Sequence, residues 1–168
     1  PGLDEVVHHA DLFLDFSGVS QQYDDQDPLP GFNGSTGAPV NSHYVNAWQP
    51  GGNIAAYPPG WGIEIPPNAD LVIEIHYGPG GVGQVDDTKI NCQFVDNPDG
   101  VRPVTASWLL NQSPSVFIDG PLVIPANQVT TFHQETSPLA NDLSIISICP
   151  HMHFLGKSYK VWYETPDG

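Results

Sequence analysis

Histidine stands out in this sequence, because imidazole both ligates transition metals and titrates near neutral pH. The chain of 168 residues carries seven histidines against four lysines and arginines. Five of the histidines lie in three short motifs, the His8-His9 pair, the strand-like stretch around His76, and the pair His151 and His153. Imidazoles grouped in this way predict binding of a late first-row transition metal.

The His-x-His pair has the simplest geometry. Residues i and i+2 of a strand project to the same face, so His151 and His153 would both reach one cation. Cys149 would share that face, whereas Met152 would point to the opposite one. The alternative interpretation is a pair of ordinary surface histidines.

The His8-His9 pair requires an irregular backbone to act as a pair of ligands. Adjacent strand residues point to opposite faces, so both imidazoles reach one metal only if the strand is bulged or ends there. His76 alternates with apolar residues that are expected to face the core, and the face that it shares with Glu74 is then the opposite one. Those core-facing residues are Leu71, Ile73, Ile75 and Tyr77. Glu74 is interpreted either as a carboxylate that orients a ligating imidazole or as a solvated side chain.

The remaining candidate site residues have weaker patterns. His43 and His133 lie outside these histidine groupings and are expected to be ordinary surface or loop residues. The acidic stretch from Asp24 to Asp27 could hold calcium, but it lacks the spacing of an EF-hand loop, and a solvated acidic turn is favoured.

Composition restricts the class of protein. Nineteen acidic and four basic residues give a formal net charge of -15, which argues against nucleic acid and anionic membrane surfaces as partners. No apolar run approaches the roughly 20 residues of a membrane span. Apolar residues make up 39% of the chain, enough for a packed core, and the 17 glycines and 18 prolines favour an all-β chain with many turns over long helices.

Short apolar or alternating runs between turn residues predict a β-sandwich architecture. The expected strands are Glu5–Phe16, Gly62–Ile65, Leu71–Tyr77, Lys89–Val95, Val104–Leu110, Val116–Ile118, Val129–Phe132, Leu143–Cys149 and Ser158–Tyr163. The turn-rich segment Ser17–Trp61 is expected to be an elaborate loop. A break in pattern near Asn111–Ser115 divides the chain into domains 1–111 and 112–168. The Asp-Gly turn at the end of the chain expects a returning strand, and a strand pattern begins within a few residues of Pro1, so both domains are expected to be truncated.

The ordered set of motifs resembles the copper type II, ascorbate-dependent monooxygenases, the family of peptidylglycine α-hydroxylating monooxygenase and dopamine β-monooxygenase. The resemblance covers nearly the whole chain and is nearer to bacterial members. The motifs that carry it are His8-His9, Trp48-Gln49-Pro50-Gly51, Tyr57-Pro58-Pro59-Gly60-Trp61-Gly62, His76-Tyr77-Gly78 and His151-Met152-His153-Phe154-Leu155-Gly156-Lys157. Spacings of 67 residues from His9 to His76 and 75 from His76 to His151 are similar to those of the family.

The resemblance implies two tandem antiparallel β-sandwich (jelly-roll-like) domains, each with one mononuclear copper. By the same resemblance, His8, His9 and His76 ligate the copper that supplies an electron. His151 and His153 ligate the second copper, where O2 binds and a small organic substrate is hydroxylated. A methionine ligand of that copper would lie beyond Gly168. The resemblance further implies ascorbate as reductant and a secreted, periplasmic or cell-surface enzyme.

Two features depart from the family pattern. Cys149 occupies the position of an arginine that holds the peptide carboxylate in the amidating members, and no lysine or arginine lies between Arg102 and Lys157. A peptide with a free carboxylate is therefore not an expected substrate. The state of Cys92 and Cys149 is open: both free, paired together, or paired elsewhere. Two alternative functions are a non-catalytic copper-binding or extracellular structural module, and an acidic adhesin-like sandwich that binds calcium.

Overall fold

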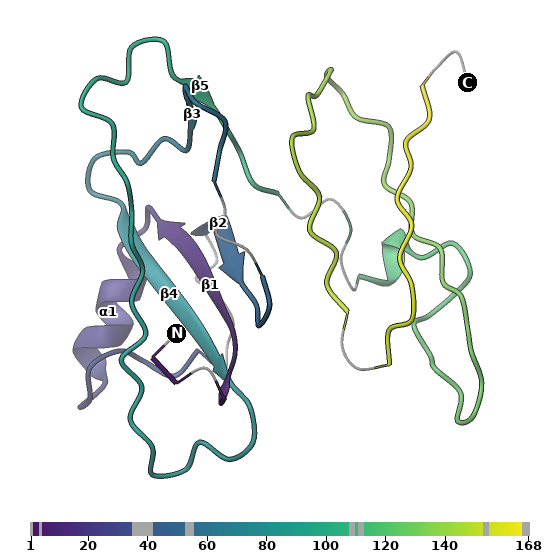
Figure 1. The fold of residues 1–168 in the computed structure, drawn as a ribbon, viewed down its shortest axis with the longest axis horizontal. Helices are drawn as coiled ribbons and strands as arrows, with labels where there is room; N and C mark the ends of the chain where they lie inside the picture. Colours follow the sequence, from purple (N-terminus) through teal and green to yellow (C-terminus); the bar gives the residue numbers. More distant parts are fainter. Residues whose placement is uncertain are drawn as a thin grey trace. The chain divides into compact units, whose positions relative to one another are not determined.

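The computed structural model describes residues 2–3, 5–34, 42–52, 56–107, 110, 113–152 and 155–165. Figure 1 shows its elements, which are β1 (Val7–Asp15), α1 (Val19–Gln26), β2 (Ser42–Trp48), β3 (Trp61–Gly62), β4 (Asp70–Tyr77), β5 (Arg102–Pro103) and the 3-10 turn η2 (Pro114–Val116). Strand residues outnumber helical ones, as composition predicts for a β-rich chain. Within the described ranges, no helix is both long and apolar enough to cross a membrane.

The chain divides into two compact units, Pro1–Trp108 and Leu109–Gly168. The first unit contains the helix, a three-stranded sheet and the short parallel pair of β3 with β5. In the described part of the second unit, the regular features are η2 and a single antiparallel bridge between Phe117 and Gln134.

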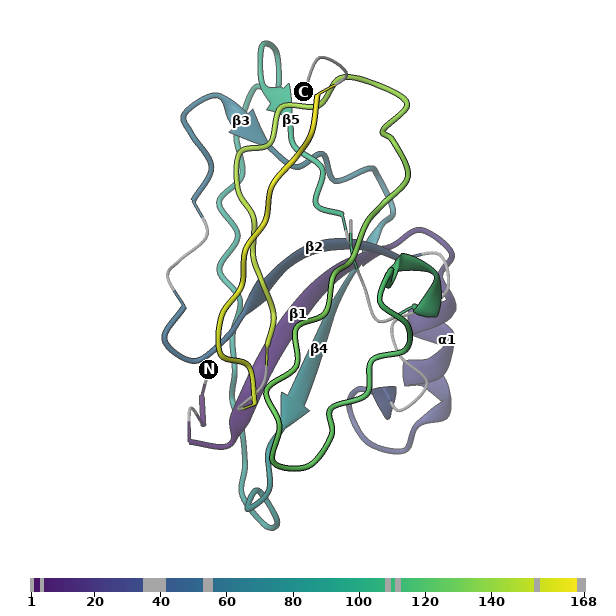
Figure 2. The same cartoon turned by 90° about the vertical axis from the view of Figure 1, so that its right-hand side faces the viewer.

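Strand β1 is the centre of the three-stranded sheet and pairs antiparallel with β2 on one side and β4 on the other. The three strands lie side by side in both Figure 1 and Figure 2. A central strand has neighbours at both edges, and β1 accordingly supplies most of the buried apolar side chains. The buried apolar residues are Val6, Val7, Ala10, Phe13 and Leu14.

The burial expected for β4 is wrong. Its predicted core-facing side chains Leu71, Ile73 and Tyr77 are 45%, 42% and 47% exposed. These side chains point out of the plane of the sheet, so their exposure shows that their face of β4 is not fully covered by another layer in the described part of the chain. Alternation in the sequence identifies which residues share a face but does not say which face is covered.

The segment Ser17–Trp61 is more regular than the expected loop. It contains α1, which packs beside β4 (Figure 1), and β2, which adds an antiparallel edge to β1. The sequence offered no strong helical periodicity here, because α1 is a polar helix of eight residues with Ser20 as its buried residue.

Helix α1 begins where the buried side chain of Asp15 meets the chain that follows β1. One carboxylate oxygen accepts hydrogen bonds from the backbone N–H and hydroxyl of Ser17, at 2.7 and 2.6 Å. The other accepts from the backbone N–H and hydroxyl of Ser20, at 2.9 and 2.7 Å. Burial raises the pKa of Asp15, but these four hydrogen bonds outweigh it and hold the pKa well below the ordinary value of 3.8. Asp15 thus joins the end of β1 to the first turn of α1.

This low pKa predicts how stability depends on pH. A carboxyl whose pKa is depressed in the folded protein stabilises it above the unfolded pKa, and that stabilisation is lost as pH falls toward the folded pKa. Below about pH 4, the free energy of unfolding should therefore fall more steeply for the wild type than for Asp15→Asn. Urea unfolding at a series of pH values measures both slopes. A gap between the two proteins that does not narrow on acidification would contradict this assignment.

Two expected strands are confirmed, since Glu5–Phe16 contains β1 and Leu71–Tyr77 lies within β4. Of Gly62–Ile65, only Gly62 joins a strand, and Val116–Ile118 holds the bridge residue Phe117. The other expected strands are wrong for their described residues, which join no ladder: Lys89–Val95, Val104–Leu110, Val129–Phe132, Leu143–Cys149 and Ser158–Tyr163. A strand requires a hydrogen-bonded neighbour, and an apolar run does not specify one.

Candidate metal centre

A bulge in β1 brings the His8-His9 pair together on one site. In the pairing of β1 with β4, Val7 lies opposite Tyr77 and His9 lies opposite His76, so His8 is an extra residue on β1. A bulge places two residues opposite one and redirects their side chains. This is the irregular backbone that the adjacent histidines require to act as a pair.

His8, His9 and His76 form one cluster in space. A ring nitrogen of each lies within 4.8 Å of a ring nitrogen of the other two. The ring centroids are 5.1 Å apart for His8 and His9, 5.2 Å for His8 and His76, and 4.9 Å for His9 and His76. The rings meet edge to face instead of stacking.

The cluster fits a metal ion held by three imidazoles. With metal–nitrogen bonds of about 2.0–2.1 Å, ligand nitrogens in tetrahedral to linear arrangements lie roughly 3.3–4.1 Å apart. The observed limit of 4.8 Å is longer, so metal binding would require the ring nitrogens to move closer together. Three imidazoles with no thiolate suit copper, zinc, nickel or iron, so the ligand set alone does not choose among these metals.

An aspartate that the sequence interpretation missed lies beside the cluster. Oδ2 of Asp11 is 3.6 Å from Nε2 of His9, and the two side chains are 16% and 15% exposed. Burial first, and then the charge of Glu74, raise the pKa of Asp11 to about 6, while His76 acts to lower it. The i, i+2 spacing of His9 and Asp11 on β1 was the available signal, by the rule already applied to His151 and His153.

Glu74 lies one pair further along the sheet from the histidines. It is opposite Asp11 in the register of β1 with β4, just as His76 is opposite His9. Directly opposite residues share a face, so four ionisable side chains, His9, Asp11, Glu74 and His76, form a polar patch there. Of these two carboxylates, Asp11 is the one with an oxygen 3.6 Å from a ring nitrogen of the cluster, Nε2 of His9.

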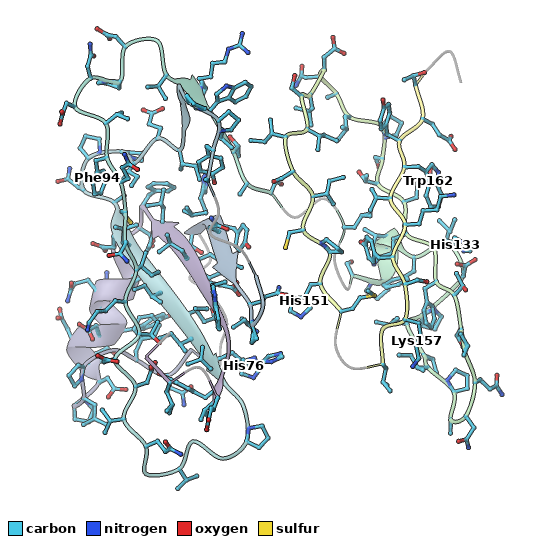
Figure 3. All side chains as sticks on the ribbon, in the orientation of Figure 1. His76, Phe94, His133, His151, Lys157 and Trp162 are labelled. Atoms are coloured by element: carbon cyan, nitrogen blue, oxygen red, sulfur yellow. The ribbon has the colours of Figure 1, made fainter. Side chains whose placement is uncertain are left out.

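The second predicted pair stays a prediction. His151 is exposed in the second unit, and Figure 3 labels it there. His153 lies outside the described residues, so the geometry of the pair is not defined. In the described chain, the grouping of three or more potential ligands is the His8, His9 and His76 cluster alone.

The two histidines expected to be unremarkable, His43 and His133, are not members of the cluster. His43 is exposed on β2, with its ring centroid 4.9 Å from that of Phe16. It is therefore in a strand and not in a loop. His133 is exposed in the second unit, where Nδ1 lies 2.7 Å from Oδ2 of Asp119 and the backbone N–H donates to the same oxygen. The expectation for His133 missed this carboxylate partner, which is distant in sequence.

Two carboxylates of the acidic stretch Asp24–Asp27 accept hydrogen bonds from backbone N–H groups of the turn that follows α1. Asp24 accepts from the backbone N–H of Gly31 at 2.6 Å, and Asp27 accepts from that of Leu29 at 3.0 Å. These carboxylates stabilise the turn after α1, which agrees with a solvated acidic turn.

Cys92 and Cys149 are exposed free thiols, so they are not paired with each other.

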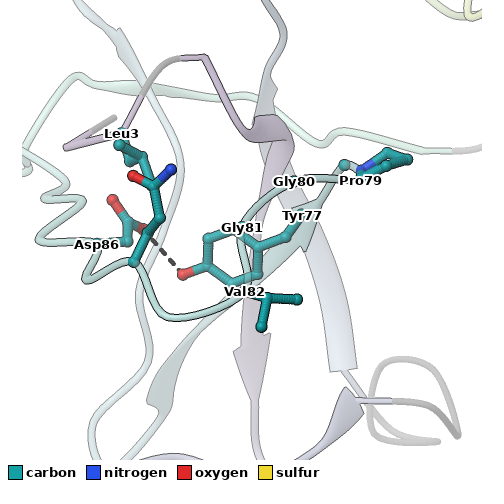
Figure 4. Close-up of a pocket in the computed structure, with 9 residues that line it drawn as sticks. Leu3, Tyr77, Pro79, Gly80, Gly81, Val82 and Asp86 are labelled. Carbon is teal, nitrogen blue, oxygen red and sulfur yellow. Dashed lines mark hydrogen bonds between the residues drawn. The ribbon is translucent and has the colours of Figure 1, made fainter.

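A separate pocket lies at the end of β4, in the glycine-rich turn that follows Tyr77 (Figure 4). Its volume is about 480 Å³, and none of the three clustered histidines lines it. The hydroxyl of Tyr77 donates to Asp86 at 2.9 Å, and the pKa of Asp86 is lowered by hydrogen bonds from Thr88 and Tyr77 that outweigh its burial. An ionised carboxylate in the wall disfavours an anion such as ascorbate.

Comparison of the chain with protein-family models, curated proteins and solved structures found no match. The family resemblance therefore depends on the motifs in the sequence.

Proposed function

We propose that this chain is the core of a copper-dependent monooxygenase that hydroxylates a small organic substrate with O2, with ascorbate as electron donor. The observation that supports it best is the convergence of His8, His9 and His76 from two adjacent strands. These are the residues that the family resemblance assigns to the first copper. The cluster's geometry supports a metal site, and the resemblance supplies the choice of copper.

In this proposal, each side chain has a defined task. The imidazoles of His8, His9 and His76 hold the first copper, and His151 with His153 provide two ligands of the second. Copper supplies the one-electron redox chemistry that no protein side chain performs alone. The stretch without cations between Arg102 and Lys157 favours a substrate without a carboxylate to bind.

The proposed architecture is two tandem antiparallel β-sandwiches. The three-stranded sheet of the first unit is one partial layer of such a fold, and the many exposed apolar side chains of the second unit are consistent with a second layer packing there. A secreted, periplasmic or cell-surface location is part of the same proposal.

Copper analysis together with oxygen consumption tests this function. The full-length protein should retain two coppers per chain and consume O2 when ascorbate and substrate are supplied. His151→Ala should reduce the copper content to about one per chain, because the ligands of the first site are intact. It should also abolish oxygen consumption, because the proposed O2-binding copper loses a ligand. His133→Ala is the matched control and should change neither quantity. A copper content well below two per chain in the wild type, or no oxygen consumption with ascorbate, would contradict the proposal.

A non-catalytic copper-binding module is the second candidate function. It is favoured by one observation, that all three clustered histidines belong to the first unit. Such a module would retain one copper per chain and would show no ascorbate-dependent oxygen consumption.

A further inference from the structure

The strongest unassigned feature next to the cluster is the contact between Asp11 and His9. Both residues are on β1, and both side chains are largely buried. Oδ2 of Asp11 approaches Nε2 of His9 to 3.6 Å, and Nδ1 of the same ring is shielded from solvent. The carboxylate therefore lies at one of the two nitrogens of this imidazole.

An imidazole can give only one nitrogen lone pair to a metal while it remains neutral. The second nitrogen then carries the proton, and the group that accepts this proton's hydrogen bond fixes both the tautomer and the ring orientation. Carboxylates serve in this way at many metal sites and increase the basicity of the ligating nitrogen. The low exposure of Asp11 strengthens such a contact, because water screens it less.

We propose that Asp11 is a positioning residue, whose carboxylate accepts a hydrogen bond from Nε2–H of His9 and so presents Nδ1 of His9 to the metal. This inference rests on the proposed metal site and deepens it. The observed separation of 3.6 Å is longer than a hydrogen bond, so the proposal requires these two side chains to lie closer together in solution.

Two other roles for Asp11 predict different behaviour. If Asp11 were itself a metal ligand, it would contribute to copper affinity even in a protein that lacks His9. A carboxylate that acts only through its charge would be matched by Glu74, which lies opposite Asp11 on the same face and is also close to the histidines. Glu74→Gln is therefore the matched control, because it removes the same charge from the same patch.

Copper titration of five proteins separates these roles: the reference protein, Asp11→Asn, Glu74→Gln, His9→Ala, and the double variant of His9→Ala with Asp11→Asn. Asp11→Asn should weaken copper binding about 10- to 100-fold, as is usual for loss of such a supporting carboxylate. Glu74→Gln should change Kd by less than about threefold, because its charge acts without a contact to a ligand. In a His9→Ala background, Asp11→Asn should change Kd by less than about twofold, since its effect passes through His9. These titrations use the His151→Ala background, so that they report the first site.

Equal losses in Asp11→Asn and Glu74→Gln would overturn the proposal in favour of a charge effect. An undiminished effect of Asp11→Asn without His9 would overturn it in favour of direct ligation.

NMR of the metal-free protein tests the same contact without any metal. We expect a downfield Nε2–H resonance of His9 that is protected from exchange, disappears in Asp11→Ala and persists in Glu74→Gln. A proton on Nδ1, or a resonance that Asp11→Ala leaves unchanged, would overturn the proposal. If the wild type binds no copper, the proposed function fails, whereas this resonance still decides the contact between Asp11 and His9.

Discussion

Replacing His76 with alanine should lower the affinity of the first site for copper by at least about 100-fold. The four ligands of a structural zinc site together provide about 10–16 kcal/mol, which is roughly 3 kcal/mol or about 100-fold for each ligand. In the proposed site His76 is the single ligand from β4, whereas His8 and His9 both come from β1. Its loss would leave two imidazoles from one strand, and among the described residues no other histidine belongs to the cluster.

Competition titration against a chelator of known affinity measures this effect, in the His151→Ala background so that one copper site remains. His43→Ala is the control, because His43 is an exposed histidine of the same sheet that lies outside the cluster. It should leave Kd unchanged within about twofold, as expected for a distant site. Comparable losses in the two variants would show that His76 is not a ligand.

Asp15→Asn should be the most destabilising substitution among the acidic residues, at about 2–4 kcal/mol. The buried carboxylate accepts four hydrogen bonds from Ser17 and Ser20. An asparagine amide has one acceptor oxygen and adds an N–H group that faces donors, so at least one buried donor loses its partner. Because these bonds fix the turn between β1 and α1, the helix should unfold with them.

Urea unfolding followed by circular dichroism measures the change in stability. Asp70→Asn is the matched control, because Asp70 lies opposite Asp15 in the pairing of β1 with β4. We expect a change below about 1 kcal/mol there, the usual size for a substitution away from a buried network. If Asp70→Asn were as destabilising as Asp15→Asn, the loss of stability would not be specific to the hydrogen bonds that Asp15 accepts from Ser17 and Ser20.

The sequence was most informative where chemistry and strand periodicity coincide. His8, His9 and His76 could be proposed as one site from their residue types and order, and the need for a bulge followed from the opposite faces of adjacent strand residues. The register that supplies this bulge could not be predicted. Register depends on which strands pair, and that choice is made by the tertiary structure.

Asp11 shows why part of the site was missed. The prediction of the site was based on histidine motifs and did not include Asp11. This residue lies two positions after His9 on the same strand, so the same spacing rule applies to it. The hydrogen bonds of Asp15 were missed for a different reason, since its partners Ser17 and Ser20 lie on either side of Gly18 in a turn-rich stretch without helical periodicity. Burial of β4 could not be predicted from alternation, because alternation shows which residues share a face and not which face another layer covers.

X-ray absorption spectroscopy of copper bound to the His151→Ala protein tests the central claim most directly. We expect one copper per chain, with the multiple-scattering signature of three imidazoles, falling to two in the additional His76→Ala variant. A copper with one imidazole or none, or a spectrum that His76→Ala leaves unchanged, would contradict the assignment of His8, His9 and His76 as a metal centre.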